Sequence, residues 1–314
     1  PMFHCNGWCF PWSITLLAGC HVFLRKTEAG LIYDAFADHK VTHLCGAPII
    51  MSMLANTDET QKRPVSQNFE LLTAAAPPPP AVIKAIEAAG ISVTHVYGLT
   101  EVYGPAVICA WKPEWNDLPA EEQARIKARQ GVAYELQEDC LVLNPATGEP
   151  VPADGETMGE IVMRGNIVMK GYLKAPEDTR KAFTDGWFWT GDLAVLHHDG
   201  YIEIRDRSKD ILISGGENIS SIEIEKVLFE HEAVSAVAVV AQPDETWGES
   251  PCAFVELMAD DAITEDDLAA YCREKLAGFK RPKRFVFGPL PKTSTGKIKK
   301  NELRQVVQAI HDNG

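Results

Sequence analysis

The chain has 314 residues, of which 46% are hydrophobic, and this is enough to bury one large core or two moderate ones. The net charge of -14 argues against a general nucleic-acid binder or a binder of anionic membranes, and no apolar run is long enough to span a membrane. Eight cysteines without repeated spacing favour a reducing compartment over a disulfide framework, so we expect a cytoplasmic protein.

Residues 1 to about 130 are predicted to alternate strands and helices. The segment AVIKAIEAAG, residues 81–90, has apolar residues at helical spacing, and the β-branched run ISVTHVYG, residues 91–98, predicts a strand. Strand, helix and strand with short links indicate a parallel α/β sheet, in which ligands bind beyond the C-terminal ends of the strands. We therefore expect binding residues in the loops after Leu72 and after Tyr97.

The rest of the chain is predicted to form a β-rich part and a separate small domain. Gly, Pro and Asp punctuate short β runs between residues 131 and 206, and residues 198–201 predict a tight hairpin turn. The charged stretch RDRSKD follows, and we expect a hinge at 206–209. Residues 207–314 are predicted to form a small, mobile α+β domain.

The stretch PLPKTSTGKIKK, residues 289–300, is similar to the start of a phosphate-binding loop. The signature of such a loop is G-x-x-x-x-G-K-[ST]. Here Pro291 replaces the first glycine and Ile298 follows Lys297, so two of the fixed positions fail. The simplest alternative is a solvated lysine in a loop. However, basic residues concentrate near this stretch, which favours an anionic partner: Lys280, Arg281, Lys283, Arg284, Lys292, Lys297, Lys299, Lys300 and Arg304.

The segment YGLTE lies at the predicted C-terminal end of a strand. The ring of Tyr97 can stack on a base, Gly98 permits close backbone approach, and Thr100 offers a hydroxyl to a phosphate. Glu101 supplies a hard oxygen ligand for Mg²⁺. The alternative is an ordinary turn with a polar tip.

Two further segments contain residues suited to a nucleotide or a thin ligand. In FWTGDLA, Asp192 can accept hydrogen bonds from both ribose hydroxyls. Arg207 can do similar work or pair with Asp206 or Asp210. In ISGGENISS, Gly215 and Gly216 permit close approach of a ligand, although the spacing alone favours a glycine turn before a helix N-cap.

His4, Cys5 and Cys9 lack the second ligand pair that a structural zinc site requires, so we expect no zinc site there.

The motifs PMFHCNGW, YGLTE, MGEIVMRG…MKGY, WTGD, RDRSKDILISGGENISSIEIE and PKTSTGK, in this order, resemble those of the adenylate-forming acyl-CoA synthetases. The resemblance covers essentially the whole chain, and one stretch is most similar to 3-methylmercaptopropionyl-CoA ligases and plant acyl-activating enzymes. It implies the fold of the C-terminal part of a large α/β plus β-barrel adenylation domain, residues 1–206, followed by the small mobile domain. It also implies a two-step reaction that forms an acyl-adenylate from ATP and then a thioester with coenzyme A.

The resemblance implies nucleotide-binding roles for residues of both domains. Tyr97 would stack on adenine, Thr100 would contact the α-phosphate, and Glu101 would hold Mg²⁺. Further contacts are implied with the base for Ala75, His95 and Val96, with the ribose for Asp192 and Arg207, and with the nucleotide from the hinge for Lys209.

The remaining implied roles concern catalysis and the thioester step. Lys297 matches the lysine of the mobile domain that stabilises charge during adenylation. His4 and Trp8 match residues that lie by the acyl site and gate passage to the second step. Gly215 and Gly216 would lie along the pantetheine arm, and the basic segment 280–284 is expected to attract the phosphates of coenzyme A.

Departures from the family pattern leave alternatives open. Ala74, Ala75 and Ala76 stand where the family usually has a glycine pair, and the phosphate loop of the family is expected upstream of Pro1. The alternatives are therefore an adenylate former that loads a carrier protein, or a truncated nucleotide-binding module without activity. We expect the substrate to be a short- or medium-chain carboxylic acid, because Trp8, Tyr103 and Trp111 are bulky enough to shorten an acyl pocket. We also expect that the protein can form a homodimer.

Overall fold

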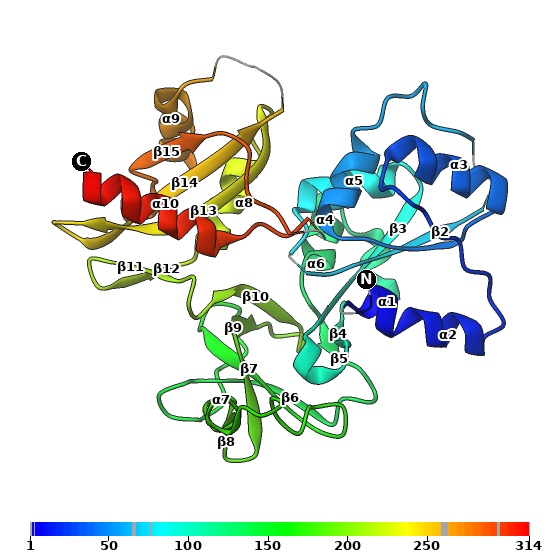
Figure 1. Cartoon of the computed structure of the whole chain (residues 1–314), viewed down its shortest axis with the longest axis horizontal. Helices are drawn as coiled ribbons and strands as arrows, with labels where there is room; N and C mark the ends of the chain where they lie inside the picture. The colour runs from blue at the N-terminus through cyan, green and yellow to red at the C-terminus, as the bar shows by residue number, and fades with distance from the viewer. Residues whose placement is uncertain are drawn as a thin grey trace. The chain divides into compact units, whose positions relative to one another are not determined.

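The computed structural model describes the chain except for residues 1, 3, 65–66, 76, 259–262, 294–295 and 314. The chain forms two compact units, whose elements can be followed in Figure 1. The first unit comprises Pro1–Thr190 and Val195–Ile204, and the second comprises Gly191–Ala194 and Arg205–Gly314. The short segment Gly191–Ala194 therefore groups with the C-terminal residues, which the sequence did not predict, and the hinge at 206–209 stays a prediction.

The first unit contains a mixed sheet with the strand order β1-β2-β3-β4-β5. Its strands are β1 (His43–Cys45), β2 (Phe69–Thr73), β3 (Ile91–Gly98), β4 (Pro105–Ile108) and β5 (Val132–Ala133). β1, β2 and β3 pair in parallel, whereas β4 is antiparallel to both of its neighbours. The parallel part confirms the predicted α/β class. Because Thr73 is in register with His95, the loops after β2 and β3 leave the same edge of the sheet.

The helices α4 (Pro48–Ala55) and α5 (Pro80–Ala88) connect the parallel strands. α5 begins with Pro80 in its first turn and buries Val82, Ile83 and Ile86. Its end is followed by Gly90 at a positive φ of 82°, a conformation that glycine adopts readily after the last turn of a helix. The other helices of this unit are α1 (Cys5–Trp8), α2 (Phe10–Leu16), α3 (Ala29–His39), α6 (Ala120–Lys127), α7 (Pro176–Ala182), η1 (Thr100–Val102) and η2 (Pro113–Asp117).

A second sheet follows, with the strand order β10-β9-β7-β6, and β8 pairs with β9. Its strands are β6 (Asp139–Leu143), β7 (Gly159–Arg164), β8 (Phe183–Thr184), β9 (Trp187–Leu196) and β10 (Ile202–Arg207). The predicted turn between β9 and β10 is confirmed, since the amide of Gly200 donates to the carbonyl of His197 at 2.9 Å and Gly200 has a φ of 83°.

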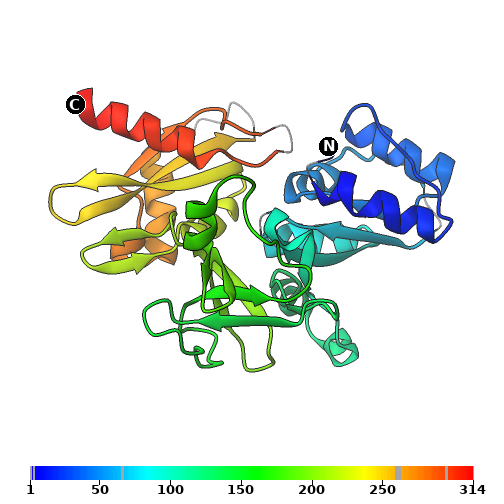
Figure 2. The ribbon, with the colours of Figure 1, turned by 60° about the horizontal axis from the view of Figure 1, so that its bottom comes forward.

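The sheet of the second unit has the order β12-β11-β14-β13, with β15 parallel to β14. Its elements are β11 (Leu212–Ser214), β12 (Glu217–Ile219), α8 (Ser221–Phe229), β13 (Val234–Asp244), β14 (Gly248–Leu257), α9 (Glu265–Lys275), η3 (Gly278–Lys280), β15 (Arg284–Phe287) and α10 (Lys300–Asn313). α8 and α9 pack on one face of the β13–β14 hairpin and α10 on the other, as Figure 2 shows. Alternate residues of β13 serve the two cores, because Val237 and Val239 belong to one and Ala238 and Val240 to the other.

The described part of the structure contains no helix with the length and hydropathy that a membrane span requires.

Candidate active site

The end of β3 carries the residues that were predicted to contact a base. Tyr97, Val96 and His95 are 9%, 3% and 2% exposed. The Nδ1 atom of His95 lies 3.0 Å from the carbonyl oxygen of Ala128 and 2.9 Å from that of Arg129. Both partners are hydrogen-bond acceptors, so Nδ1 must carry a proton and donate it to them. The ring of His95 is thus held against the end of α6, and its contact with a base stays a prediction.

Gly98 is required by the fold of the turn that follows β3. A Cβ atom at Gly98 would collide with the carbonyl oxygen of Gly104. The chain therefore folds back on itself here, and Tyr103 takes a positive φ of 73° to complete the turn. Close backbone contact does occur at Gly98, but the chain itself makes it, and the approach of a ligand stays a prediction.

Glu101 is held in place by the MKGY segment. The hydroxyl of Tyr172 donates to Glu101 Oε1 at 2.9 Å, and the amide of Met169 donates to the carbonyl oxygen of Glu101 at 2.7 Å. Burial, followed by this hydrogen bond, raises the pKa of Tyr172 to about 12, so the hydroxyl remains a donor at neutral pH. Next to it, Thr100 begins η1 and is exposed, where its hydroxyl is accessible to a ligand.

His4 and Trp8 bracket the first helix, α1. The carbonyl of His4 accepts the amides of Gly7 and Trp8 at 2.8 and 2.9 Å and so starts the helix. The ring of Trp8 makes edge contacts with Trp12 and Tyr103, with ring centroids 6.1 and 6.2 Å apart. Two of the aromatics expected near an acyl group, Trp8 and Tyr103, are thus in contact, and Trp12 joins them without having been predicted.

Trp111, the third aromatic of that expectation, packs among different partners. Its ring lies 5.2 Å from that of Trp115, its indole N–H donates to Asn116 at 2.7 Å, and the amino group of Lys127 lies 4.7 Å from its centroid. The expected role of Trp111 in an acyl pocket therefore receives no support from its contacts.

Ala75 has a backbone conformation that favours glycine. Its φ is 80°, in the region that L-residues rarely adopt, and it lies in the loop after β2. This explains physically why a glycine pair suits the position, as the family resemblance implied. Ala76 lies outside the described residues.

In the second unit, Asp192 and Arg207 form an ion pair. The Nε atom of Arg207 lies 3.3 Å from Asp192 Oδ1, and Asp192 is 5% exposed. Ser208 anchors the neighbouring backbone, because both its amide and its hydroxyl donate to the carbonyl of Gly191, at 2.9 and 3.1 Å. A buried carboxylate beside a guanidinium suits the diol of a ribose, whereas the sequence had suggested Asp206 or Asp210 as the partner of Arg207.

Lys297 follows a tight loop that precedes α10. The amide of Thr293 donates to the carbonyl of Lys297 at 2.8 Å, and the amide of Lys297 donates to Thr293 Oγ1 at 3.1 Å. Gly296, at a φ of 85°, completes the loop. The backbone of Lys297 is thereby held, while its side chain as a whole is exposed.

The charges around Lys297 are those expected of a phosphate-binding lysine. Partial burial of the amino group lowers the pKa of Lys297, and the nearby cations of Arg207 and Lys209 lower it further, whereas Asp192 acts in the opposite direction. The structure therefore brings Lys297, Arg207, Lys209 and Asp192 into one neighbourhood within the second unit. Repelling cations of this kind favour an anion among them.

Gly215 and Gly216 form the two-residue turn of the β11–β12 hairpin. Their φ values are 60° and 88°, and Ser214 and Glu217 pair on either side. A Cβ atom on Gly215 would lie 2.9 Å from the ring of Trp247, whereas Gly216 borders open space. The two glycines therefore form a turn, as the alternative interpretation of the sequence held, although the sequence did not predict strand β12. Of the two, only Gly216 has the space that a thin ligand needs.

Much of the predicted basic cluster is paired within the second unit. Lys280 lies 2.7 Å from Glu223, Lys283 lies 2.9 Å from Asp244, and Arg281 donates to backbone carbonyls. Because these cations are partly neutralised, the charge argument for coenzyme A phosphates at 280–284 is weaker than the sequence suggested.

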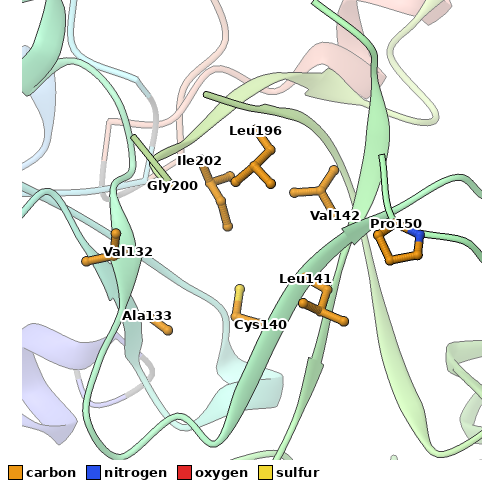
Figure 3. Close-up of a pocket in the computed structure, with 9 residues that line it drawn as sticks. All are labelled: Val132, Ala133, Cys140, Leu141, Val142, Pro150, Leu196, Gly200 and Ile202. Carbon is orange, nitrogen blue, oxygen red and sulfur yellow. The ribbon is translucent and has the colours of Figure 1, made fainter. Parts of the chain in front are cut away.

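A separate cavity of about 110 Å³ lies in the first unit beneath the second sheet. Figure 3 shows the residues that line it: Val132, Ala133, Cys140, Leu141, Val142, Pro150, Leu196, Gly200 and Ile202. Burial raises the pKa of the Cys140 thiol to about 12, so it stays protonated. An apolar lining without a reactive group does not suit the binding of a nucleotide or the transfer of an acyl group.

The described residues contain no cluster of three His, Cys, Asp or Glu side chains able to hold a metal ion. Burial also raises the pKa of Cys5 and Cys9, which disfavours the thiolates that zinc requires.

The candidate residues thus fall into two groups, one in each unit. Tyr172 and Trp12 were missed as site residues, although the MKGY motif that contains Tyr172 was a visible signal.

Family models and curated proteins match this chain. The model described as AMP-binding enzyme matches residues 1–173, and the model described as AMP-binding enzyme C-terminal domain matches residues 223–297. A peroxisomal acetate/butyrate–CoA ligase of Arabidopsis thaliana is 53% identical over 97% of the chain and 54% of that protein. A 2-methylpropanoate–CoA ligase of Humulus lupulus is 51% identical over 99% of the chain and 56% of that protein. The chain spans about half the length of these curated relatives.

Solved structures agree with the fold. The chain superposes on the ATP-bound MatB structure from Rhodopseudomonas palustris with a TM-score of 0.83 and 29% identity. The match covers 99% of this chain and 59% of that one. It supports the predicted architecture of the C-terminal part of an adenylation domain followed by a small domain.

Proposed function

Because the chain belongs to the AMP-binding enzyme family, we propose that the protein is an ATP-dependent acyl-CoA ligase. The observation that carries the proposal is the identity above 50%, over nearly the whole chain, with ligases that act on short acids. The geometry is consistent with it, since the ion pair of buried Asp192 with the partly exposed Arg207 lies near a lysine with a lowered pKa.

In the first proposed step, a carboxylate oxygen of the acid attacks the α-phosphorus of ATP, and pyrophosphate leaves. Negative charge accumulates on phosphate oxygens, and Lys297 is the cation proposed to stabilise it. One preorganised donor of this kind is typically worth about 3 kcal/mol of barrier. Asp192 and Arg207 are proposed to hold the ribose, and Tyr97 and Thr100 to bind the base and the α-phosphate.

Glu101 is the residue proposed to hold Mg²⁺. A single carboxylate fits this ion, which commonly takes one or two carboxylates together with substrate phosphates. The hydrogen bond from Tyr172 engages only Oε1 and fixes the orientation of the group. When bound, the ion would neutralise phosphate charge and increase the electrophilicity of the phosphorus.

In the second proposed step, the thiol of coenzyme A attacks the acyl carbonyl, and AMP leaves. Lys297 must then withdraw to admit the thiol, which the hinge at Lys209 would permit. His4 and Trp8 are proposed to gate this passage, and Gly216 to border the pantetheine arm.

The proposed substrate is a short-chain acid within the predicted short- to medium-chain range. The Arabidopsis and Humulus relatives are ligases of acetate or butyrate and of 2-methylpropanoate. The rings of Trp8, Tyr103 and Trp12 are in contact, and we propose that this bulky aromatic cluster limits the length of the acyl group.

A coupled assay tests the proposal. The full-length protein would be incubated with ATP, Mg²⁺, coenzyme A and acids from acetate to octanoate, and AMP and acyl-CoA would be measured separately. We expect equal amounts of both products with a short acid. Release of AMP without a thioester would instead identify an adenylate former with another acceptor, and absence of both products would favour a nucleotide-binding module.

Compartment and assembly remain proposals. The cysteine content favours the cytoplasm, whereas the Arabidopsis relative is named peroxisomal. Fluorescence microscopy of a tagged full-length protein distinguishes these compartments, and light scattering tests the homodimer.

A further inference from the structure

Lys300 lies at the start of α10, three residues after Lys297, and its amino group sits between groups of α8. It lies 2.6 Å from Ser221 Oγ and 2.7 Å from Glu225 Oε1. Glu225 Oε1 also accepts the amide of Val239 at 2.8 Å, which fixes the carboxylate. Burial acts to lower the pKa of Lys300, yet Glu225 and then Asp206 raise it above its ordinary value, so the group is charged at neutral pH.

Ser221 links Lys300 to Asp206, the last residue before Arg207. Asp206 is 1% exposed, and its Oδ2 accepts the amide and the hydroxyl of Ser221 at 2.5 and 2.7 Å. Its Oδ1 accepts the amide of Arg207 at 2.7 Å. We call these four residues, Asp206, Ser221, Glu225 and Lys300, the Asp206 network.

Arg304 extends the contact one turn along the same face of α10. It pairs with Asp210 and lies 3.4 Å from the carbonyl of Lys209. α10 therefore contacts Lys209 and Asp210 directly and reaches Asp206 through Ser221, at the two ends of the segment in which the hinge is proposed.

The Asp206 network crosses the proposed hinge in the sequence. Asp206 precedes Lys209, whereas Ser221, Glu225 and Lys300 follow it. All four residues lie in the second compact unit. A rotation about Lys209 would displace Asp206 relative to Ser221, so we expect the Asp206 network to form in only one of the two proposed arrangements. In the arrangement described here, Lys297 lies near Arg207 and Asp192.

We propose that Lys300 is a positioning residue for adenylation: by completing the Asp206 network, it holds Lys297 and Arg207 in the arrangement of the first step. This inference rests on the proposed function and its hinge. A charged group is tolerated in such a buried location only when it is paired and hydrogen-bonded, as Lys300 is here. The proposed effect of the network passes through Lys297 and Arg207 and requires no contact of Lys300 with the nucleotide.

The test compares Lys300→Met with Lys299→Met in the full-length protein. Lys299 is the neighbouring residue, but it pairs with Glu302 at the surface at 2.8 Å. We expect Lys300→Met to slow acyl-adenylate formation roughly 10- to 100-fold, the cost of a misplaced catalytic group. Thioester formation from a supplied acyl-adenylate should stay within about 2-fold, and Lys299→Met should stay within about 2-fold in both steps.

Hydrogen–deuterium exchange supplies a readout that does not depend on activity. The amides of Ser221 and Arg207 are protected by Asp206 and should exchange faster in Lys300→Met but not in Lys299→Met. If the wild-type protein forms no acyl-CoA, the proposed function is wrong. The hydrogen–deuterium exchange of Ser221 and Arg207 then still tests whether Lys300 holds the Asp206 network together. Unchanged exchange, or equal loss in both half-reactions, would overturn the inference.

A second variant covers the case in which Lys300→Met does not fold. Lys300→Met combined with Glu225→Gln removes the uncompensated carboxylate while still breaking the contact with Ser221. We expect this double variant to show the same selective loss of adenylation. Wild-type adenylation in the double variant would mean that Lys300 only compensates buried charge, which would also overturn the inference.

Discussion

Removal of the Tyr172 hydroxyl tests whether Glu101 depends on the MKGY segment. The hydroxyl donates to Glu101 Oε1 across 2.9 Å. A hydrogen bond to a charged group contributes about 1.5–3 kcal/mol. Because Tyr172 is 39% exposed, solvent screening favours the lower end. A free-energy difference of about 1.4 kcal/mol corresponds to a tenfold change in a dissociation constant. We therefore expect Tyr172→Phe to weaken the binding of a divalent cation about 10-fold. Losses of this size are usual when a residue that hydrogen-bonds to a metal ligand is removed.

Paramagnetic resonance of Mn²⁺ in the presence of a non-hydrolysable ATP analogue measures this affinity. The matched control is Tyr201→Phe, which removes a hydroxyl that donates to the carbonyl of Ala110 at 2.6 Å. An unchanged Mn²⁺ affinity in Tyr172→Phe would refute the assigned support of Glu101. An equal loss in Tyr201→Phe would trace the effect to general destabilisation and would refute it as well.

Four further predictions concern Lys297, Asp192 and Ala75. Lys297→Ala should slow adenylation about 10²- to 10³-fold while sparing thioester formation from a supplied acyl-adenylate, and an equal loss in both steps would contradict its role. Burial and the neighbouring Arg207 lower the pKa of Lys297. As pH rises, the adenylation rate should therefore begin to fall before the pH reaches the ordinary pKa of lysine, which is about 10.4. Lys297→Arg should abolish this decline, because arginine stays charged over this pH range. Asp192→Asn should raise the KM for ATP roughly 10-fold, since a charged hydrogen bond to the ribose is weakened, and an unchanged KM in steady-state assays would exclude the ribose contact. Ala75→Gly should stabilise the fold by about 1 kcal/mol, because φ is 80°, and a lower thermal unfolding midpoint would contradict that strain.

Features that depend on local chemistry follow from the amino-acid sequence alone. The α/β pattern of residues 81–98, the hairpin at Gly200 and the cap of α9 at Thr264 all depend on residues near one another in sequence. Local propensities and turn chemistry are enough to predict such features.

Contacts between distant segments could not be read in this way. Nothing near Glu101 in the sequence indicates that Tyr172 donates to it, and nothing near Lys300 indicates Asp206. The basic cluster likewise resembled a site for an anion, whereas in the fold its lysines pair with carboxylates such as Glu223 and Asp244.

The PKTSTGK segment shows both sides of this comparison. The spacing around Lys297 was sufficient to reject a phosphate loop, because Pro291 and Ile298 occupy positions that the loop requires for other residues. Which charges surround Lys297 depends on how Asp192 and the segment 207–210 lie around it within the second unit. Side-chain electrostatics act through space rather than along the chain, so the neighbourhood of Arg207, Lys209 and Asp192 that gives this lysine its lowered pKa exists only once the chain has folded.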